Sequence, residues 1–90
     1  MKSVPTTKIE AVNMLLKEMS PADKNYVKNL KKDDLVLLHH TLGRAIRNNF
    51  ELWAGNQALL KDVAKPHPDD AAMVIIRELW NNLNALGNGK

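Results

Sequence analysis

Apolar residues recur every three or four positions through most of the chain, and no stretch shows the strict alternation that is typical of a half-buried strand. The longest helical pattern runs from Asp34 to Asn56. Steps of about 100° per residue gather its apolar residues on one arc of a helix. These are Leu35, Leu38, Leu42, Ala45, Ile46, Phe50, Leu52 and Trp53. The pattern predicts an all-α fold with this segment as its central helix.

Capping signals place two helices before this segment. Thr7 followed by Glu10 has the spacing of a capping box and begins a helix that we expect to end near residue 19. Ser20-Pro21 places an N-cap and a first-turn proline at the start of a second helix, over 21–30. The residues that we expect to be buried are Ile9, Val12, Leu15, Leu16 and Met19 in the first helix and Tyr26, Val27 and Leu30 in the second.

The central helix is expected over 34–52, capped by Asp33 or Asp34. Gly43 lies in its middle, and a residue of such low helix propensity indicates either that another backbone approaches closely there or that the helix tolerates it. Gly55 suits the left-handed position that ends a helix.

Two helices follow the central one. Asn56 is expected to cap a short helix over 57–64. Asp69 and Asp70 lie where the first turn of a last helix favours negative charge, and Gly87 ends that helix. Its apolar face consists of Ala72, Met73, Ile75, Ile76, Leu79, Trp80, Leu83 and Leu86.

Ninety residues allow one domain, so the sequence predicts a compact bundle of four main helices plus one short helix over 1–90, with 1–6 and 88–90 frayed. The chain has no cysteine, which excludes disulfides and thiolate metal sites and fits a reducing compartment. It begins without the apolar run of a signal peptide and has no stretch long enough to cross a membrane. We therefore expect a cytoplasmic protein.

The net charge of +3 gives a weak indication of nucleic-acid binding. Lys24, Lys28 and Lys31 or Lys32 follow the polar side of the second helix and are able to meet phosphates, with help from the arginines of the central helix. A solvated helix face explains the same lysines, because such a stripe is ordinary on a surface helix. We keep nucleic-acid binding as the alternative function.

The histidines and aspartates give little indication of a metal site or of a catalytic site. His39 and His40 are neighbours on the predicted helix, so their side chains diverge, and a metal site would need His67 and carboxylates brought in by the fold. Asp69 and Asp70 resemble paired catalytic carboxylates, but neighbouring aspartates in a first turn are more typical of capping. We expect no metal, no cofactor and no enzymatic activity.

Arg44, Arg47 and Asn48 share one face of the central helix. Asp69 and Asp70 are their natural partners, because guanidinium groups form bidentate pairs with carboxylates. If these groups face one another they join the last helix to the central one, and if they face outward they bind an anion or a partner protein. We favour the first interpretation.

Trp53 and Asn56 form a second pair of interest. Trp53 is either a core residue where three helices meet, with its indole N–H bonded to a turn carbonyl, or an anchor in a protein interface. We expect it in the core.

The motifs GRAIRN (43–48), LWAGN (52–56) and HPDD (67–70) are weak one by one but more specific in combination. Together they resemble a family of short bacterial and phage-associated domains of unknown function, over about residues 20–84. The resemblance implies a helical domain without an assigned activity. It directs attention to one set of candidate binding residues: Arg44, Arg47, Asn48, Trp53, Asn56, His67, Asp69 and Asp70.

Without a catalytic motif, the small size favours a non-catalytic protein-binding or regulatory module. Met14, Leu37 and Val74 fall on polar helix faces and are expected to be exposed, where they would contact another protein or a second copy of the chain in a homodimer.

Overall fold

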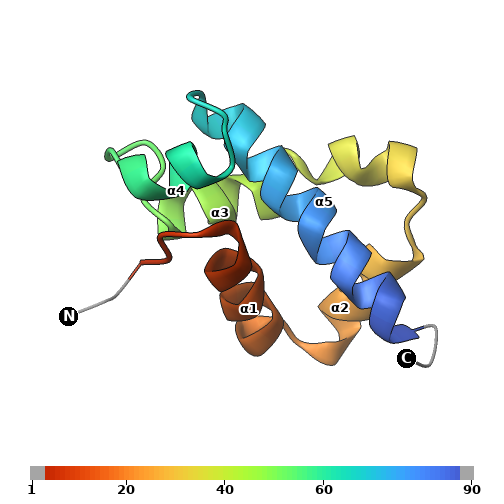
Figure 1. The fold of residues 1–90 in the computed structure, drawn as a ribbon. Helices are drawn as coiled ribbons and strands as arrows, with labels where there is room; N and C mark the ends of the chain where they lie inside the picture. The colour runs from red at the N-terminus through yellow and green to blue at the C-terminus, as the bar shows by residue number, and fades with distance from the viewer. Residues whose placement is uncertain (1–3, 88–90) are drawn as a thin grey trace.

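The computed structural model describes residues 4–87, and this part of the chain is all-α (Figure 1). The predicted fold class is confirmed. The elements in chain order are α1 (Lys8–Glu18), α2 (Pro21–Asn29), the 3₁₀ helix η1 (Lys32–Leu38), α3 (Leu42–Asn49), α4 (Gln57–Asp62) and α5 (Pro68–Gly87).

The last helix, α5, organises the fold. It runs diagonally across the molecule and contacts α1, α2, η1 and α3 (Figure 1). Its expected apolar face is confirmed, with Ala72, Ile75, Ile76 and Leu79 fully enclosed. The side chain of Leu86 lies outside the described residues. The central role therefore belongs to α5 and not to the segment 34–56.

The expected long helix over 34–52 is wrong. The segment divides into η1, a turn over 39–41, and α3. A 3₁₀ helix has three residues per turn, so Leu35 and Leu38 lie on the same edge, and both are buried. His39, His40 and Thr41 have modest helix propensity, and the break at these residues lets η1 and α3 pack separately against α5.

The ends of the predicted central helix also differ. Neither Asp33 nor Asp34 caps η1, whose N-cap is Lys31 without a side-chain hydrogen bond. At the other end, Glu51 takes the left-handed conformation (φ 57°) in place of Gly55. The Leu52 N–H donates to the Arg47 carbonyl (3.0 Å) and the Glu51 N–H to the Asn48 carbonyl (3.3 Å), which is a Schellman ending. Gly55 has φ 96° in the turn that follows.

The predicted caps of α1 and α2 are confirmed. The Glu10 N–H donates to Thr7 Oγ1 (3.1 Å), and the Asp23 N–H donates to Ser20 Oγ (3.1 Å). The Glu10 carboxylate accepts from the Thr6 N–H (2.9 Å) and hydroxyl (3.0 Å). These hydrogen bonds, the backbone one first, lower the pKa of Glu10.

In α1 and α2, two residues expected in the core are exposed instead, Ile9 and Tyr26. In α1 the fully enclosed residue is Ala11, whose small side chain permits a close approach to α5. Ala11 lies about 200° from Ile9 on a helix, so turning Ala11 inward takes Ile9 to solvent. In α2 only Val27 is buried, and Tyr26 lies about 100° away from it.

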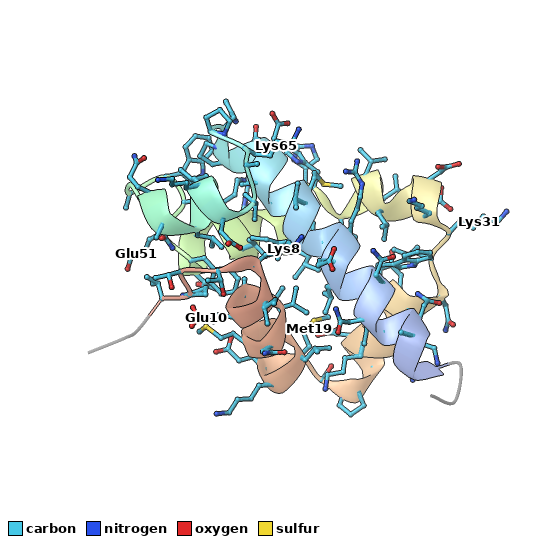
Figure 2. The ribbon with its side chains drawn as sticks, viewed as in Figure 1. Lys8, Glu10, Met19, Lys31, Glu51 and Lys65 are labelled. Carbon is cyan, nitrogen blue, oxygen red and sulfur yellow. The ribbon has the colours of Figure 1, made fainter. Side chains whose placement is uncertain are left out.

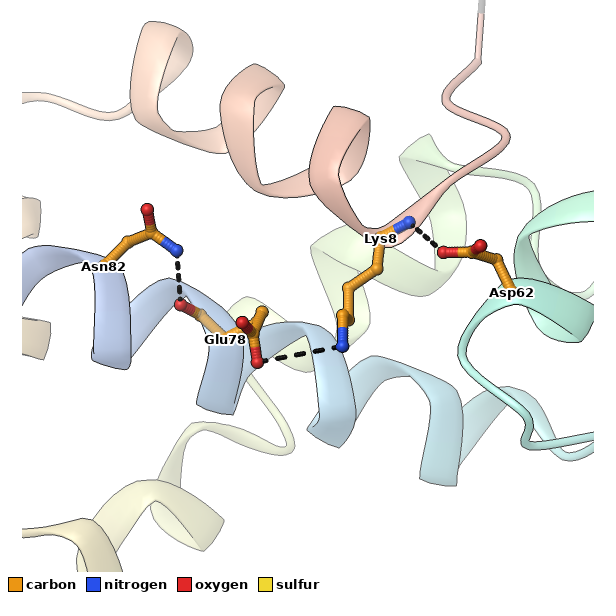
Figure 3. Close-up of polar contacts among 4 residues, drawn as sticks. All are labelled: Lys8, Asp62, Glu78 and Asn82. Atoms are coloured by element: carbon orange, nitrogen blue, oxygen red, sulfur yellow. Dashed lines mark hydrogen bonds and ion pairs between the residues drawn. The ribbon is translucent and has the colours of Figure 1, made fainter.

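Lys8 joins the start of α1 to two other helices (Figure 3). Its backbone N–H donates to Asp62 Oδ2 at the end of α4 (2.7 Å), and its Nζ lies 3.9 Å from Glu78 Oε2 on α5. The Asp62 carboxylate thus complements the positive end of α1. Within residues 4–87 no helix is both long and apolar enough to cross a membrane.

Candidate functional site

The last turn of α3 meets the first turn of α5 through one ion pair. Arg47 Nε lies 3.3 Å from Asp69 Oδ1. The expected pairing between these helices therefore forms, with Arg47 and Asp69 as its members. Arg47 was expected on the polar arc of the helix, yet only 7% of it is exposed. It is buried because the break before α3 and the crossing of α5 place this face of α3 inside the molecule.

Gly43 provides the room for the Arg47 side chain. A Cβ at position 43 would lie 3.1 Å from Arg47 Nη1 and 3.3 Å from the Leu38 carbonyl oxygen. The backbone that comes close to Gly43 is the Leu38 carbonyl at the end of the preceding η1, and the neighbour from α5 is the side chain of Ile76, with Cδ1 3.8 Å from that Cβ. Arg47 Nη1 is buried and has no hydrogen-bond partner within the described residues. We call Gly43, Arg47, His67 and Asp69 the Arg47 junction.

Three candidate binding residues are not part of the Arg47 junction. Arg44, Asn48 and Asp70 are exposed. No ion pair joins Arg44 or Asp70 to another side chain in the part of the chain that the structure describes. The expected network of Arg44, Arg47, Asp69 and Asp70 is therefore reduced to one pair.

His67 caps α5. Its carbonyl accepts from the Ala71 N–H (3.0 Å), and its Nδ1 accepts from the Asp69 N–H (3.2 Å) and lies 4.0 Å from Asp69 Oδ2. The Trp53 ring lies edge to face with the His67 ring, with 5.9 Å between the centroids. Trp53 is exposed, so its expected place in the core is wrong. It follows the Schellman ending of α3, which turns the chain out of the helix before residue 53.

Asn56 holds three segments together. Its Oδ1 accepts from the Leu59 N–H (3.3 Å), which confirms it as the cap of α4. Its Nδ2 donates to the carbonyls of Pro5 (2.9 Å) and Phe50 (2.8 Å). This one amide thus fixes the start of α4 against the end of α3 and the segment before α1, which is a structural role.

The two neighbouring histidines lie in the turn between η1 and α3 and contact each other. The rings of His39 and His40 lie edge to face, with 4.9 Å between their centroids. Within residues 4–87 no group of three His, Asp or Glu side chains is arranged as a set of metal ligands.

An open groove that the sequence analysis missed lies between the end of α1, α2, the end of η1 and the start of α3. Its volume is about 430 Å³. Met19 lies at the junction of α1 and α2 (Figure 2), and it is part of the lining of the groove. We call it the Tyr26 groove; its lining is mostly apolar and consists of Met19, Asp23, Tyr26, Val27, Leu37, Leu38, Thr41, Leu42 and Ala45.

Two large apolar side chains of this lining face solvent. Tyr26 is 59% exposed and Leu37 is 64% exposed. The expected exposure of Leu37 is confirmed, whereas Met14 and Val74 are half-buried and pack against the core. The isolated position of Leu37 among polar residues predicted an exposed apolar side chain, but it gave no sign of the hollow beside it. Tyr26 gave no such signal, because it falls beside Val27 on an apolar arc.

The lysines of the predicted basic stripe do not form one free face. Lys24 and Lys28 are half-buried along α2, and the Lys28 carbonyl accepts from Asn84 Nδ2 (3.4 Å). Lys31 and Lys32 are exposed at the start of η1, directly before Asp33. Acidic groups therefore interrupt the positive charge of this region.

A comparison with protein-family models matches residues 4–83 to a domain of unknown function, DUF6794. The comparisons with curated proteins and with solved structures gave no match. The expected membership in a family without an assigned activity is confirmed, while its association with bacteria and phages stays a prediction. The chain belongs to the DUF6794 family.

Proposed function

We propose that this chain is a non-catalytic protein-binding module that holds its partner in the Tyr26 groove. The observation that carries this proposal is the exposure of Tyr26 and Leu37 beside an apolar hollow. Exposed apolar side chains that gather around a concavity are typical of interaction sites, whereas single scattered ones are ordinary.

The local structure of η1 supports this interpretation. Leu35 and Leu38 on one edge of the 3₁₀ helix are buried, so the same short helix that anchors itself to α5 holds Leu37 away from the core. The backbone position of Leu37 is therefore set by packing on another edge of η1. A partner meets a backbone that is already in place, so only the side chain is ordered on binding, which lowers the entropic cost.

The expected strength of binding follows from the apolar area. Full burial of a large apolar side chain contributes about 1.5–3 kcal/mol, so covering the exposed parts of Tyr26 and Leu37 contributes about 2–4 kcal/mol. Additional contacts along the groove must offset the loss of translational and rotational freedom. We expect a transient complex that forms and dissociates, rather than an obligate one.

The polar candidates support a non-catalytic role because their groups already serve the fold. Asp69 pairs with Arg47, and His67 Nδ1 accepts the N–H of Asp69. The three hydrogen bonds of the Asn56 side-chain amide within the described residues all go to backbone atoms. Acid–base chemistry needs a carboxylate and a base that are free to exchange protons with a substrate.

Nucleic-acid binding is the alternative and has less support. Arg47 is buried in its ion pair and does not reach a phosphate. Of the basic residues predicted to contact phosphates, this leaves Arg44 and the lysines at 24, 28, 31 and 32, and acidic residues lie among these lysines. Gel retardation with duplex DNA and with RNA at low salt tests this alternative. Retardation that decreases steeply with added salt would favour it, and its absence would remove it.

The proposal is tested by selecting binders from a random-peptide display library on the wild-type protein. The selected peptides are then measured on Leu37→Ser and on Val36→Ser. Val36 is a matched control, because it is the neighbouring residue, is 62% exposed and lies outside the groove lining. We expect binding to weaken at least tenfold on Leu37→Ser and to stay within twofold on Val36→Ser. Equal binding to all three proteins, or no enriched peptide, would contradict the proposal.

A further inference from the structure

The charged residue in the lining of the Tyr26 groove is Asp23. It lies exposed in the first turn of α2, and its carboxylate takes part in no ion pair within residues 4–87. Its backbone N–H, not its carboxylate, makes the capping contact to Ser20. The groove therefore offers a negative charge that has no ion-pair partner among these residues and is balanced only by the positive end of α2, beside an apolar surface.

Asp23 has an aromatic neighbour on the same side of α2. Residues three and four positions apart lie next to each other on a helix, which groups Asp23 with Tyr26 and Val27, and all three line the groove. A carboxylate beside the face or edge of an aromatic ring suits a lysine or arginine. The carboxylate attracts the charge, the ring contributes a cation–π contact, and the apolar lining receives the alkyl stem.

The extent of the surface distinguishes between possible occupants. A standard interface buries about 800 Å² per partner. The exposed large apolar residues of the groove are Tyr26 and Leu37, and the others in the described part, Ile9, Val36 and Trp53, lie outside its lining. Two such residues around a hollow of about 430 Å³ fit a short segment better than the flat, extensive contact of a second copy.

Building on the proposed function, we infer that the groove binds a short amphipathic segment of a partner protein whose apolar residues are adjacent to a lysine or arginine. The apolar residues cover Leu37 and Tyr26, and the cation pairs with Asp23. An acidic segment would bring like charges together at Asp23 and would be rejected, so this residue sets the preference for partners more than it adds affinity.

A charge-reversal experiment tests this inference with peptides selected on the wild-type protein. We expect them to be enriched in Lys or Arg beside apolar residues. Because the Asp23 pair is exposed, replacing the peptide's cation with Gln should weaken binding about two- to fivefold, and Asp23→Lys should weaken it further through repulsion. A peptide carrying Glu in place of the cation should bind Asp23→Lys better than it binds the wild type.

Asp33→Lys is the matched control, because Asp33 is an exposed aspartate in the first turn of η1 and the change alters the net charge equally. It lies outside the groove lining and should leave peptide binding within twofold. Circular dichroism of each variant confirms that the helical protein is folded at the temperature of measurement.

The outcomes separate this inference from the proposed function. Peptides that depend on Leu37 but are neutral or acidic, or that bind Asp23→Lys and Asp33→Lys equally, would overturn the inference and leave the proposed function standing. Peptides that do not depend on Leu37 would overturn both. A wild-type dimer that Leu37→Ser dissociates in analytical ultracentrifugation would show that the occupant is a second copy, which also overturns the inference.

Discussion

The Arg47 junction and the Tyr26 groove use opposite sides of the same short helix. On one side of α3, Gly43 and Arg47 are buried and the guanidinium group pairs with Asp69. On the other, Leu42 and Ala45 line an open hollow beside exposed apolar residues. One charged side chain, that of Arg47, is enclosed in the first region, and apolar side chains face solvent in the second. A conspicuous polar motif can thus hold a fold together while a plain apolar surface is available for binding.

Among the candidate binding residues, the largest effect on stability is expected at Asn56. Replacing it with Ala removes the cap of α4 and leaves the Pro5 and Phe50 carbonyls without this donor. We expect the free energy of unfolding to fall by about 2–3 kcal/mol. Asn48→Ala is the control, because Asn48 is exposed, and it should change stability by less than about 0.5 kcal/mol. Urea unfolding followed by circular dichroism measures both. Similar values for the two variants would contradict a structural role of the LWAGN motif.

A smaller loss is expected at Asp69. Asp69→Ala leaves the buried Arg47 charge without its partner, and because the Asp69 side chain is 39% exposed we expect about 1–2 kcal/mol of destabilisation. Asp70→Ala is the control, because it removes a charge from the same helix end without breaking an ion pair. The loss of interaction with the helix dipole should be similar in the two variants. If chemical denaturation gives equal losses for the two variants, the Arg47 junction adds nothing to stability beyond the helix dipole.

Glu51 lies two residues after the last residue of α3 and has a left-handed backbone, which is unfavourable for a residue with a side chain. Glu51→Gly relieves this cost but adds entropy to the unfolded chain, and we expect a net stabilisation of about 0.5 kcal/mol. Glu18→Gly, at the end of α1, should instead destabilise, because Glu18 has an ordinary helical backbone. Thermal unfolding of both variants measures the difference, and a loss of stability in Glu51→Gly would contradict the Schellman ending.

The smallest change in stability is expected in the Tyr26 groove. Leu37→Ser removes an exposed side chain, so the free energy of unfolding should stay within about 0.5 kcal/mol of the wild type. Leu38→Ser, one residue on, places a hydroxyl in the core and should cost more than about 2 kcal/mol. A large loss in Leu37→Ser would show that this residue serves the fold and would weaken its assignment to binding.

The all-helical class, the caps of α1, α2 and α4 and the apolar face of α5 were predictable, because each depends on neighbouring residues. Thr7, Ser20 and Asn56 all cap the helices that their spacing predicted. The break at 39–41 was not predictable, because Leu35 and Leu38 share one edge of both a 3₁₀ helix and an α-helix. Periodicity alone does not distinguish the two, and packing against α5 selects the 3₁₀ form.

The candidate site was predictable only in part, because some of its features depend on how the helices pack and not on neighbouring residues. The ion pair of Arg47 with Asp69 follows from chemistry, since an arginine and an aspartate at two neighbouring helix ends attract. That Arg47 is buried while Arg44 is exposed depends on the crossing of α3 with α5, which is a tertiary property. The exposure of Trp53 and Tyr26 likewise depends on where α3 ends and how α2 is rotated.

The most direct test is the affinity of a selected peptide for Leu37→Ser relative to Val36→Ser, measured by fluorescence anisotropy at a temperature where both are folded. These neighbouring side chains are almost equally exposed, but only Leu37 lines the Tyr26 groove. A binding role for the groove predicts affinity at least tenfold weaker for Leu37→Ser and within twofold of the wild type for Val36→Ser. Equal affinities for the two variants would contradict it.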